Sequence, residues 1–353
     1  MKTIRIAVIS LFSLLLMNQC KSRNDQSQLR EFSGNREEAC LFGSSTLPVM
    51  GSSGAEQLDL LTWKIIGSLA EASEAAYLNA AGVEQKAKSW GYPNVEHFVY
   101  DSMYGYLMTN DKCAVLVFRG TDMKSFRDWM VNFKASTVNL KSDGAVHKGF
   151  YTAATNLYTQ VIRALKREGV SRKNFWVTGH SLGGALAGVF AYKSKFERWI
   201  GDGPDMHKVV TFGQPLFADA VLAKKMRNTF INVYYRVVNE TDLVAKVPFW
   251  MKHFGSLVWL RNGNVDFRPD RYLATGGHGS GKPEVAEADI PKELTADEEA
   301  YQEFLEQTKN LPQGQVMPDH IRVMGGIEWP KFLDDHLMGN YIRRINREID
   351  EYK

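Results

Sequence analysis

The chain has 353 residues, which fits one large domain or two small ones. Its hydrophobic content of 44% and charged content of 24% are ordinary for a globular protein and exclude a disordered or collagen-like chain. The formal net charge of +3 indicates no basic surface of the strength that nucleic-acid binding requires, so no nucleic-acid partner is expected.

The first twenty residues have the pattern of an export signal. Lys2 and Arg5 precede an apolar run over residues 6–17, which is shorter than the roughly 18–20 residues of a membrane span. Cys20 follows this run, where a bacterial lipoprotein carries its lipidated cysteine. Two outcomes stay open: a lipoprotein of the cell envelope, or a cleaved chain that is periplasmic or secreted. Residues 21–55 are polar and are expected to form a tether.

Cys40 and Cys113 remain as an even pair if Cys20 is lipidated or removed. In an oxidising compartment such a pair favours a disulfide, which would attach the N-terminal arm to a strand. The alternative is two unpaired thiols, with Cys113 buried in its strand.

Helical and strand patterns alternate through residues 56–353. Apolar residues recur with helical spacing over 59–80 and 152–167. Runs rich in β-branched and aromatic residues predict strands at 113–118, 175–178, 209–212, 233–238 and 257–260. This alternation predicts an α/β fold with a mostly parallel central sheet flanked by helices. An acidic excursion around 268–330 interrupts it and is expected to be a solvated insertion, with a cap or partner-binding element as the alternative.

The most specific motif is Gly179-His180-Ser181-Leu182-Gly183-Gly184, between a predicted strand and a helix rich in small residues. In this context a serine lies on a sharp, strained turn and presents its hydroxyl at the edge of the sheet. The glycines two positions before and after Ser181 are expected because a Cβ there would collide with the neighbouring turn. The pattern predicts that Ser181 is a nucleophile.

A nucleophilic serine needs a histidine to take its proton and a carboxylate to orient that histidine, in the chain order serine, acid, histidine. The loop after the strand at 233–238 supplies Asp242 and Glu240 as candidate acids, with Asp219 as an outsider. Candidate histidines by position are His253, His278, His320 and His336. His336 fits best because it begins the last helical segment, whereas His253 precedes the last strand and is expected to be structural.

A series of further motifs is informative because of the order in which the motifs occur along the chain. It comprises Val117–Thr121, Val146–Phe150, the elbow Thr178–Ala187, Phe212–Pro215, Val237–Val244, and Asp335-His336 with Tyr341. From about Leu58 to Arg344, the chain resembles a class 3 (fungal-type) lipase of the α/β-hydrolase fold. The resemblance implies Asp242 rather than Glu240 as the acid, and His336 as the histidine. One departure is Leu216, where the family usually has arginine.

Two backbone N–H groups are expected to stabilise the oxyanion of an acyl-transfer reaction. One belongs to Leu182, the residue after the nucleophile, and the resemblance implies Thr121 as the other. The segment 122–135 has five apolar residues at helical intervals on one face: Met123, Phe126, Trp129, Met130 and Phe133. The family carries a mobile lid at this place; a fixed surface helix is the alternative.

The resemblance implies a serine hydrolase that cleaves carboxylic esters of lipids, like a triacylglycerol lipase, at a lipid–water interface. A phospholipase A1 or another carboxylesterase of the same fold is the alternative, and a non-catalytic envelope-anchored binding protein is the remote one. No metal or cofactor is expected, because the metalloprotease, Cys-x-x-Cys and dinucleotide-binding motifs are absent from the sequence. Acyl chain length, head group and protein partners stay open.

Overall fold

The computed structural model describes residues 36–46, 58–121, 136–197, 204–261, 264–271, 323–324, 327–328 and 335–351. The predicted signal segment, the predicted lid at 122–135 and most of the tether and of the excursion around 268–330 lie outside these ranges. So do the candidate histidines His278 and His320. None of the helices in these ranges has the length and apolar character that would let it cross a membrane.

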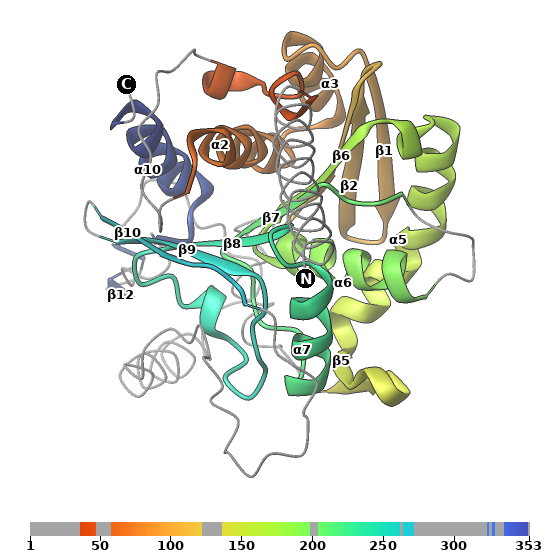
Figure 1. Ribbon diagram of the computed structural model, residues 1–353, viewed down its shortest axis with the longest axis vertical. Helices are drawn as coiled ribbons and strands as arrows, with labels where there is room; N and C mark the ends of the chain where they lie inside the picture. Colours follow the sequence, from red (N-terminus) through yellow and green to blue (C-terminus); the bar gives the residue numbers. More distant parts are fainter. Residues whose placement is uncertain are drawn as a thin grey trace, which may run out of the picture.

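An eight-stranded sheet forms the centre of the protein, in the order β1-β2-β3-β6-β7-β8-β9-β10 (Figure 1). Neighbours from β3 to β9 pair in parallel, while β1, β2 and β10 join antiparallel at the two edges. The strand bounds are β1 Asn94–Tyr100, β2 Met103–Thr109, β3 Cys113–Phe118, β6 Asn174–His180, β7 Lys208–Phe212, β8 Tyr234–Asn239, β9 Ser256–Arg261 and β10 Asn264–Arg268. The predicted mostly parallel α/β sheet is confirmed.

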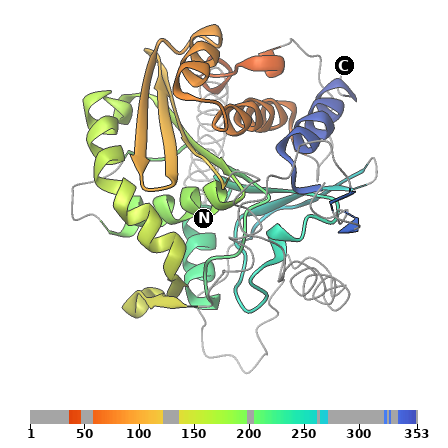
Figure 2. The same ribbon diagram turned by 180° about the vertical axis from the view of Figure 1, so that it is seen from behind.

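Helices cover both faces of this sheet, as the front and back views show (Figures 1 and 2). One face packs against α2 (Leu60–Ala75), α3 (Ala80–Ser89) and α10 (Met338–Glu351), and the other against α5 (Lys148–Arg167), α6 (Leu182–Phe196) and α7 (Ala220–Thr229). The shorter elements are β4 Thr137–Asn139, β5 Ala145–His147, β11 Val323–Met324, β12 Ile327–Glu328, η1 Gly43–Thr46, η2 Lys141–Asp143, η3 Val170–Arg172 and η4 Val244–Lys246.

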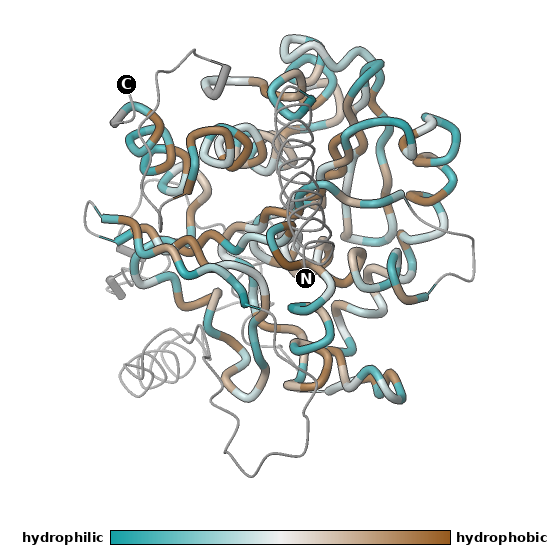
Figure 3. The backbone as a smooth tube through the Cα atoms, viewed as in Figure 1, coloured by the Kyte–Doolittle hydropathy of each residue, from teal (hydrophilic) through white to brown (hydrophobic). Residues whose placement is uncertain are grey.

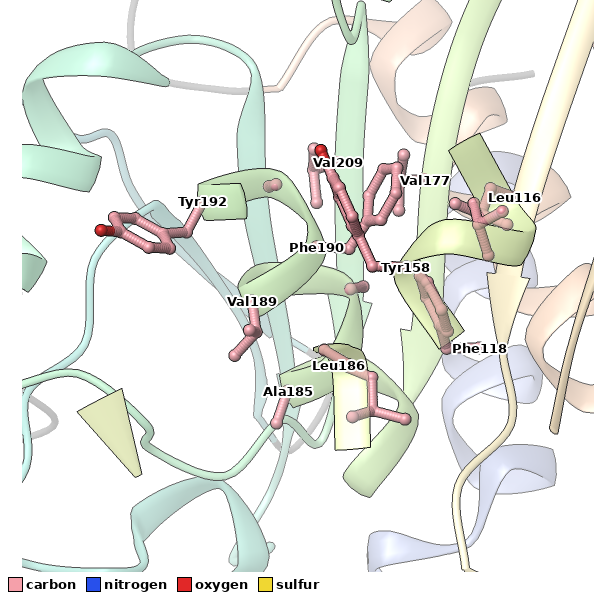
Figure 4. Close-up of a cluster of buried hydrophobic side chains, with 14 of the residues drawn as sticks. Leu116, Phe118, Tyr158, Val177, Ala185, Leu186, Val189, Phe190, Tyr192 and Val209 are labelled. Carbon is pink, nitrogen blue, oxygen red and sulfur yellow. The ribbon is translucent and has the colours of Figure 1, made fainter. Parts of the chain in front are cut away.

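The two cores follow from the alternation of side chains along the strands. Leu116 and Phe118 of β3 face the α5–α6 side, whereas Val115 and Val117 face the α2–α10 side. Figure 4 shows Leu116 and Phe118 beside apolar residues of α6, among them Phe190. Figure 3 shows that hydrophobic positions concentrate in the central strands and the helix faces that cover them. Both faces of β3 are buried, which is why its sequence is an uninterrupted apolar run.

The structure agrees with the predicted strands to within two residues and corrects the predicted helices. The helix expected over 59–80 ends at Ala75, and α3 starts anew at Ala80 because the Asn79 side chain caps it by accepting from the Gly82 N–H at 2.9 Å. The helix expected from 152 already begins at Lys148. Strands β1, β2 and β10 had not been predicted; β1 and β10 are the two edge strands, where the burial pattern is mixed.

The predicted disulfide between Cys40 and Cys113 is confirmed, with the two Cα atoms 5.6 Å apart. It attaches the segment before η1 to the first residue of β3. Phe42, two residues after Cys40, is buried with Tyr92 and Trp90, so the arm is also held by apolar packing.

Candidate active site

Ser181 lies at the turn between β6 and α6, at the carboxyl end of a central strand. Its φ of 58° and ψ of −131° are rare for a residue other than glycine, and such a conformation costs about 1–3 kcal/mol. The turn is held by a hydrogen bond of 2.9 Å from the Ser181 N–H to the Phe212 carbonyl at the end of β7. The strained turn predicted from the motif is therefore present.

The flanking glycines allow this turn because the backbone passes close on both sides. A Cβ on Gly179 would overlap the carbonyl of Gly183, and a Cβ on Gly183 would overlap the carbonyl of Phe118 in β3. Ser181 itself is 1% exposed, and its Oγ makes no hydrogen bond within the described part of the chain. Burying a hydroxyl without such a bond costs free energy, so a functional role is the natural explanation for it.

Asp242 and His336 form a hydrogen-bonded pair beside this turn. His336 Nδ1 lies 2.9 and 3.0 Å from the two carboxylate oxygens of Asp242, and both side chains are almost completely buried. A carboxylate only accepts, so Nδ1 carries the hydrogen and Nε2 is the basic nitrogen of the ring. Asp242 also accepts from the Tyr341 hydroxyl at 2.5 Å and from the Val244 N–H at 2.9 Å.

Because Gly213 has no side chain, the Asp242–His336 pair can lie against the turn that carries Ser181. Gly213 follows β7, directly after the residue that accepts from the Ser181 N–H, and its φ is +54°. A Cβ there would lie 2.6 Å from Asp242 Oδ2 and 2.8 Å from His336 Nδ1. The histidine–carboxylate pair and the turn of Ser181 therefore both contact the same short stretch of backbone at Phe212 and Gly213.

The other candidate acids have different contacts. Glu240 forms an ion pair with Arg344 at the start of the loop that carries Asp242. Asp219 caps α7 by accepting from the Leu222 N–H at 2.8 Å. Neither residue contacts His336 in the interactions that the structure shows, whereas Asp242 does.

His253, which the sequence predicted to be structural, binds the main chain instead. Its Nε2 lies 2.6 Å from the Ala245 carbonyl oxygen. Burial, together with the nearby Arg236, lowers the pKa of His253 well below its ordinary value.

Of the two expected oxyanion donors, Leu182 directly follows Ser181 in the chain, and Thr121 follows a residue that packs against Ser181. Leu182 is the first residue of α6, where N–H groups have no partner within the helix and the helix dipole favours negative charge. Gly120, the residue before Thr121, packs so closely that a Cβ on it would lie 3.1 Å from the Ser181 Cβ and 2.6 Å from the His180 carbonyl oxygen. The backbone that leads into Thr121 therefore runs against the nucleophile turn.

Sequence reasoning missed two polar side chains at this site, His180 and Tyr77. His180 is 5% exposed; its Nε2 lies 2.7 Å from the His336 carbonyl oxygen and its Nδ1 lies 2.9 Å from the Tyr77 hydroxyl. Burial, with a smaller effect of His336, lowers the pKa of His180 to about 3, so the ring is neutral. The position of His180 directly before the candidate nucleophile was the available signal for it; nothing local pointed to Tyr77.

The described residues hold no group of three or more His, Cys, Asp or Glu side chains suited to a metal ion. The site thus combines a strained buried serine, a histidine–carboxylate pair, the N-terminus of α6 and the backbone of Gly120 packed against Ser181. Comparison with known proteins gives this arrangement its context. The family model for class 3 lipases matches residues 115–252, which include the elbow and Asp242.

The chain resembles class 3 lipases over these residues. Among its relatives, a triacylglycerol lipase, OBL1, of Ricinus communis is 31% identical over 197 residues, covering 41% of this chain and 37% of the relative. A lipase of Rhizomucor miehei is 30% identical over 164 residues, covering 44% of each chain. The alignments thus span less than half the length of either relative.

Solved structures support the same fold. The Lip2 lipase of Yarrowia lipolytica superposes with a TM-score of 0.50 at 24% identity, covering 62% of this chain and 88% of that one. The chain therefore has the α/β-hydrolase fold that its motifs led us to expect.

Proposed function

We propose that this protein is a serine hydrolase of the class 3 lipase type that cleaves the carboxylic ester bonds of lipids, in the manner of a triacylglycerol lipase. One observation carries the proposal: a buried histidine–carboxylate pair, His336 and Asp242, lies against the strained turn of Ser181. A triacylglycerol lipase among the relatives supports the lipid ester as substrate.

The proposed reaction has two acyl-transfer steps. His336 Nε2 accepts the Ser181 hydroxyl proton as Oγ attacks the ester carbonyl, and Asp242 stabilises the imidazolium that forms. When the tetrahedral intermediate collapses, the C–O bond to the alcohol breaks and the leaving alcohol takes the proton from His336. Water then attacks the acyl-serine, His336 takes and returns a proton in the same way, and the carboxylic acid leaves.

The oxyanion of each intermediate is proposed to accept from the backbone N–H groups of Leu182 and Thr121. The position of Leu182 at the helix N-terminus and the close packing of Gly120 on Ser181 support this assignment. Removing one donor of this kind usually lowers turnover by about 10²–10³-fold.

Phospholipids are the second candidate substrate, because a relative of Arabidopsis thaliana that is 29% identical over 157 residues is named phospholipase A(1) DAD1. Both substrates carry the same acyl ester, and a lipid–water interface is the proposed place of action for either. The described site offers no contact that separates the two, so the assay has to compare them directly.

Export of the protein is proposed from its N-terminal sequence and is supported by the disulfide, because disulfides persist in oxidising compartments. A Fusarium solani relative, 27% identical over 214 residues, is named a secreted mono- and diacylglycerol lipase. The mass of the mature N-terminal peptide tests whether Cys20 is lipidated in a cell-envelope lipoprotein or lost from a periplasmic or secreted chain.

The decisive experiment compares wild type with Ser181→Ala on soluble p-nitrophenyl esters, triacylglycerol and phospholipid. Wild type is expected to hydrolyse esters and to react with a fluorophosphonate probe, while the variant, which loses only a hydroxyl, stays folded and does neither. Labelling of the variant would mean that another serine is the nucleophile. A wild type that binds lipid but neither labels nor hydrolyses would support the non-catalytic binding protein instead.

A further inference from the structure

His180 contacts His336 at two points although the two residues are 156 positions apart in the chain. Its Nε2 lies 2.7 Å from the His336 carbonyl oxygen. Its ring also packs on the His336 ring, with centroids 4.6 Å apart and planes inclined by 32°. One side chain thus touches both the main chain and the ring face of the histidine that is proposed to carry the proton.

The hydrogen bonds define the tautomer of His180. A carbonyl oxygen only accepts, so Nε2 carries the hydrogen, and in the neutral ring Nδ1 is then the acceptor for the Tyr77 hydroxyl at 2.9 Å. The neutral imidazole has one donor and one acceptor, and both are used. The Tyr77 hydroxyl, just after α2, therefore binds the ring nitrogen that does not bind the His336 carbonyl.

The remaining contacts around His336 hold other parts of it. Asp242 binds the Nδ1 edge of its ring, and Asp335 before it is held by Asn239 and Thr241, at 2.8 and 2.6 Å. His180 contacts the face of the His336 ring and the His336 carbonyl oxygen. Reacting groups have to stay within about 0.5 Å of their productive geometry, which requires restraint from more than one direction.

We propose that His180 is a positioning residue for acyl transfer: its uncharged ring fixes the main chain and ring face of His336 and so keeps His336 Nε2 directed at Ser181 Oγ. This inference rests on the proposed function. An uncharged ring is also needed for a second reason, since a positive charge 4.6 Å from His336 would oppose formation of the His336 imidazolium. Burial keeps the pKa of His180 at about 3 and thereby maintains the neutral form.

The main test replaces His180 by phenylalanine, which keeps an aromatic ring and removes both hydrogen bonds. We expect kcat on a soluble p-nitrophenyl ester to fall at least about tenfold, with KM within about twofold, because geometry rather than binding is disturbed. The rate of fluorophosphonate labelling of Ser181 is expected to fall in parallel. His180→Gln keeps an N–H that can reach the carbonyl and is expected to recover most of this loss.

His253→Phe is the matched control. His253 is also a histidine whose pKa burial lowers and whose Nε2 binds a carbonyl oxygen, that of Ala245, but it does not contact His336. Comparable losses of thermal stability with a fall of kcat only in His180→Phe would support positioning. An unchanged kcat in folded His180→Phe, an equal loss in His253→Phe, or a His180→Gln variant no faster than His180→Phe would overturn it.

Tyr77→Phe keeps the inference testable if His180→Phe does not fold. It removes only the hydroxyl that binds His180 Nδ1, and we expect labelling of Ser181 to slow severalfold; an unchanged rate would overturn the proposal. The acid limb of the wild-type kcat/KM profile should keep its shape in His180→Gln, because His180 stays neutral. If the acid limb of the wild-type profile depends on two protons and that of His180→Gln on one, His180 is charged at working pH. That result would also overturn the proposal.

The two proposals fail in different ways. If wild type neither labels nor hydrolyses esters, the proposed function is wrong and the positioning role goes with it. If wild type is active and His180→Phe matches it, only the positioning role is wrong.

Discussion

Replacing Gly213 by alanine should strongly reduce the proposed ester hydrolysis through a single methyl group. The Cβ would lie 2.6 Å from Asp242 Oδ2 and 2.8 Å from His336 Nδ1, and ordinary contacts begin at 3.4 Å. The carboxylate therefore has to retreat by about 0.8 Å, or the imidazole by a similar amount. A displacement of about 1 Å at a reacting group costs about 10²-fold in rate, so we expect kcat/KM to fall by that factor, equivalent to about 2.7 kcal/mol.

Gly169→Ala controls for the backbone strain of this substitution. Gly169 has a φ of +61°, close to the +54° of Gly213, but a Cβ there would meet no atom within 4 Å. Each variant should lose about 1–2 kcal/mol of stability from the left-handed conformation alone. Only Gly213→Ala should lose activity as well.

The assay measures kcat/KM on a soluble p-nitrophenyl ester and thermal unfolding of both variants. A folded Gly213→Ala variant whose kcat/KM stays within about threefold of wild type would contradict the loss expected from displacement. A Gly169→Ala variant that loses as much activity would show that strain, and not the contact with Asp242 and His336, is responsible.

Three further outcomes follow from other parts of the structure. His336→Ala should lower kcat by several orders of magnitude, whereas His253→Ala should lower the melting temperature and leave kcat nearly unchanged; steady-state kinetics with thermal unfolding separates the two. Removing the disulfide with Cys40→Ser and Cys113→Ser, which frees a loop of sequence separation 73, should lower the free energy of unfolding by about 4 kcal/mol in denaturant titrations, and a loss below about 1 kcal/mol would contradict this. Burial lowers the pKa of His180 from 6.5 to about 3, so between these pH values the unfolded chain binds more protons than the folded one. Stability should therefore fall as the pH drops through this window, by up to about 1.4 kcal/mol per pH unit, and His180→Gln should show a shallower slope in unfolding experiments from pH 7 to 4.

Features encoded by neighbouring residues could be predicted from the sequence. The run Cys113–Phe118 indicated a strand buried on both faces, and Gly179, Ser181 and Gly183 indicated a strained turn, because the steric conflicts involved lie within a few residues. Their order along the chain, and the resemblance to a family, then pointed to Asp242 and His336. The structure brings these two side chains together.

Contacts between distant segments were decided by the tertiary structure alone. Tyr77 is 103 positions from His180, and nothing in the sequence just after α2 indicates that its hydroxyl binds at the site. The edge strands β1 and β10 escaped prediction because they are only partly buried, so their apolar periodicity is weak. His180 itself was visible in the motif, but its partners were not. Which carbonyl it binds depends on how the segment before α10 packs against the carboxyl edge of the sheet, and that packing is a property of the whole fold.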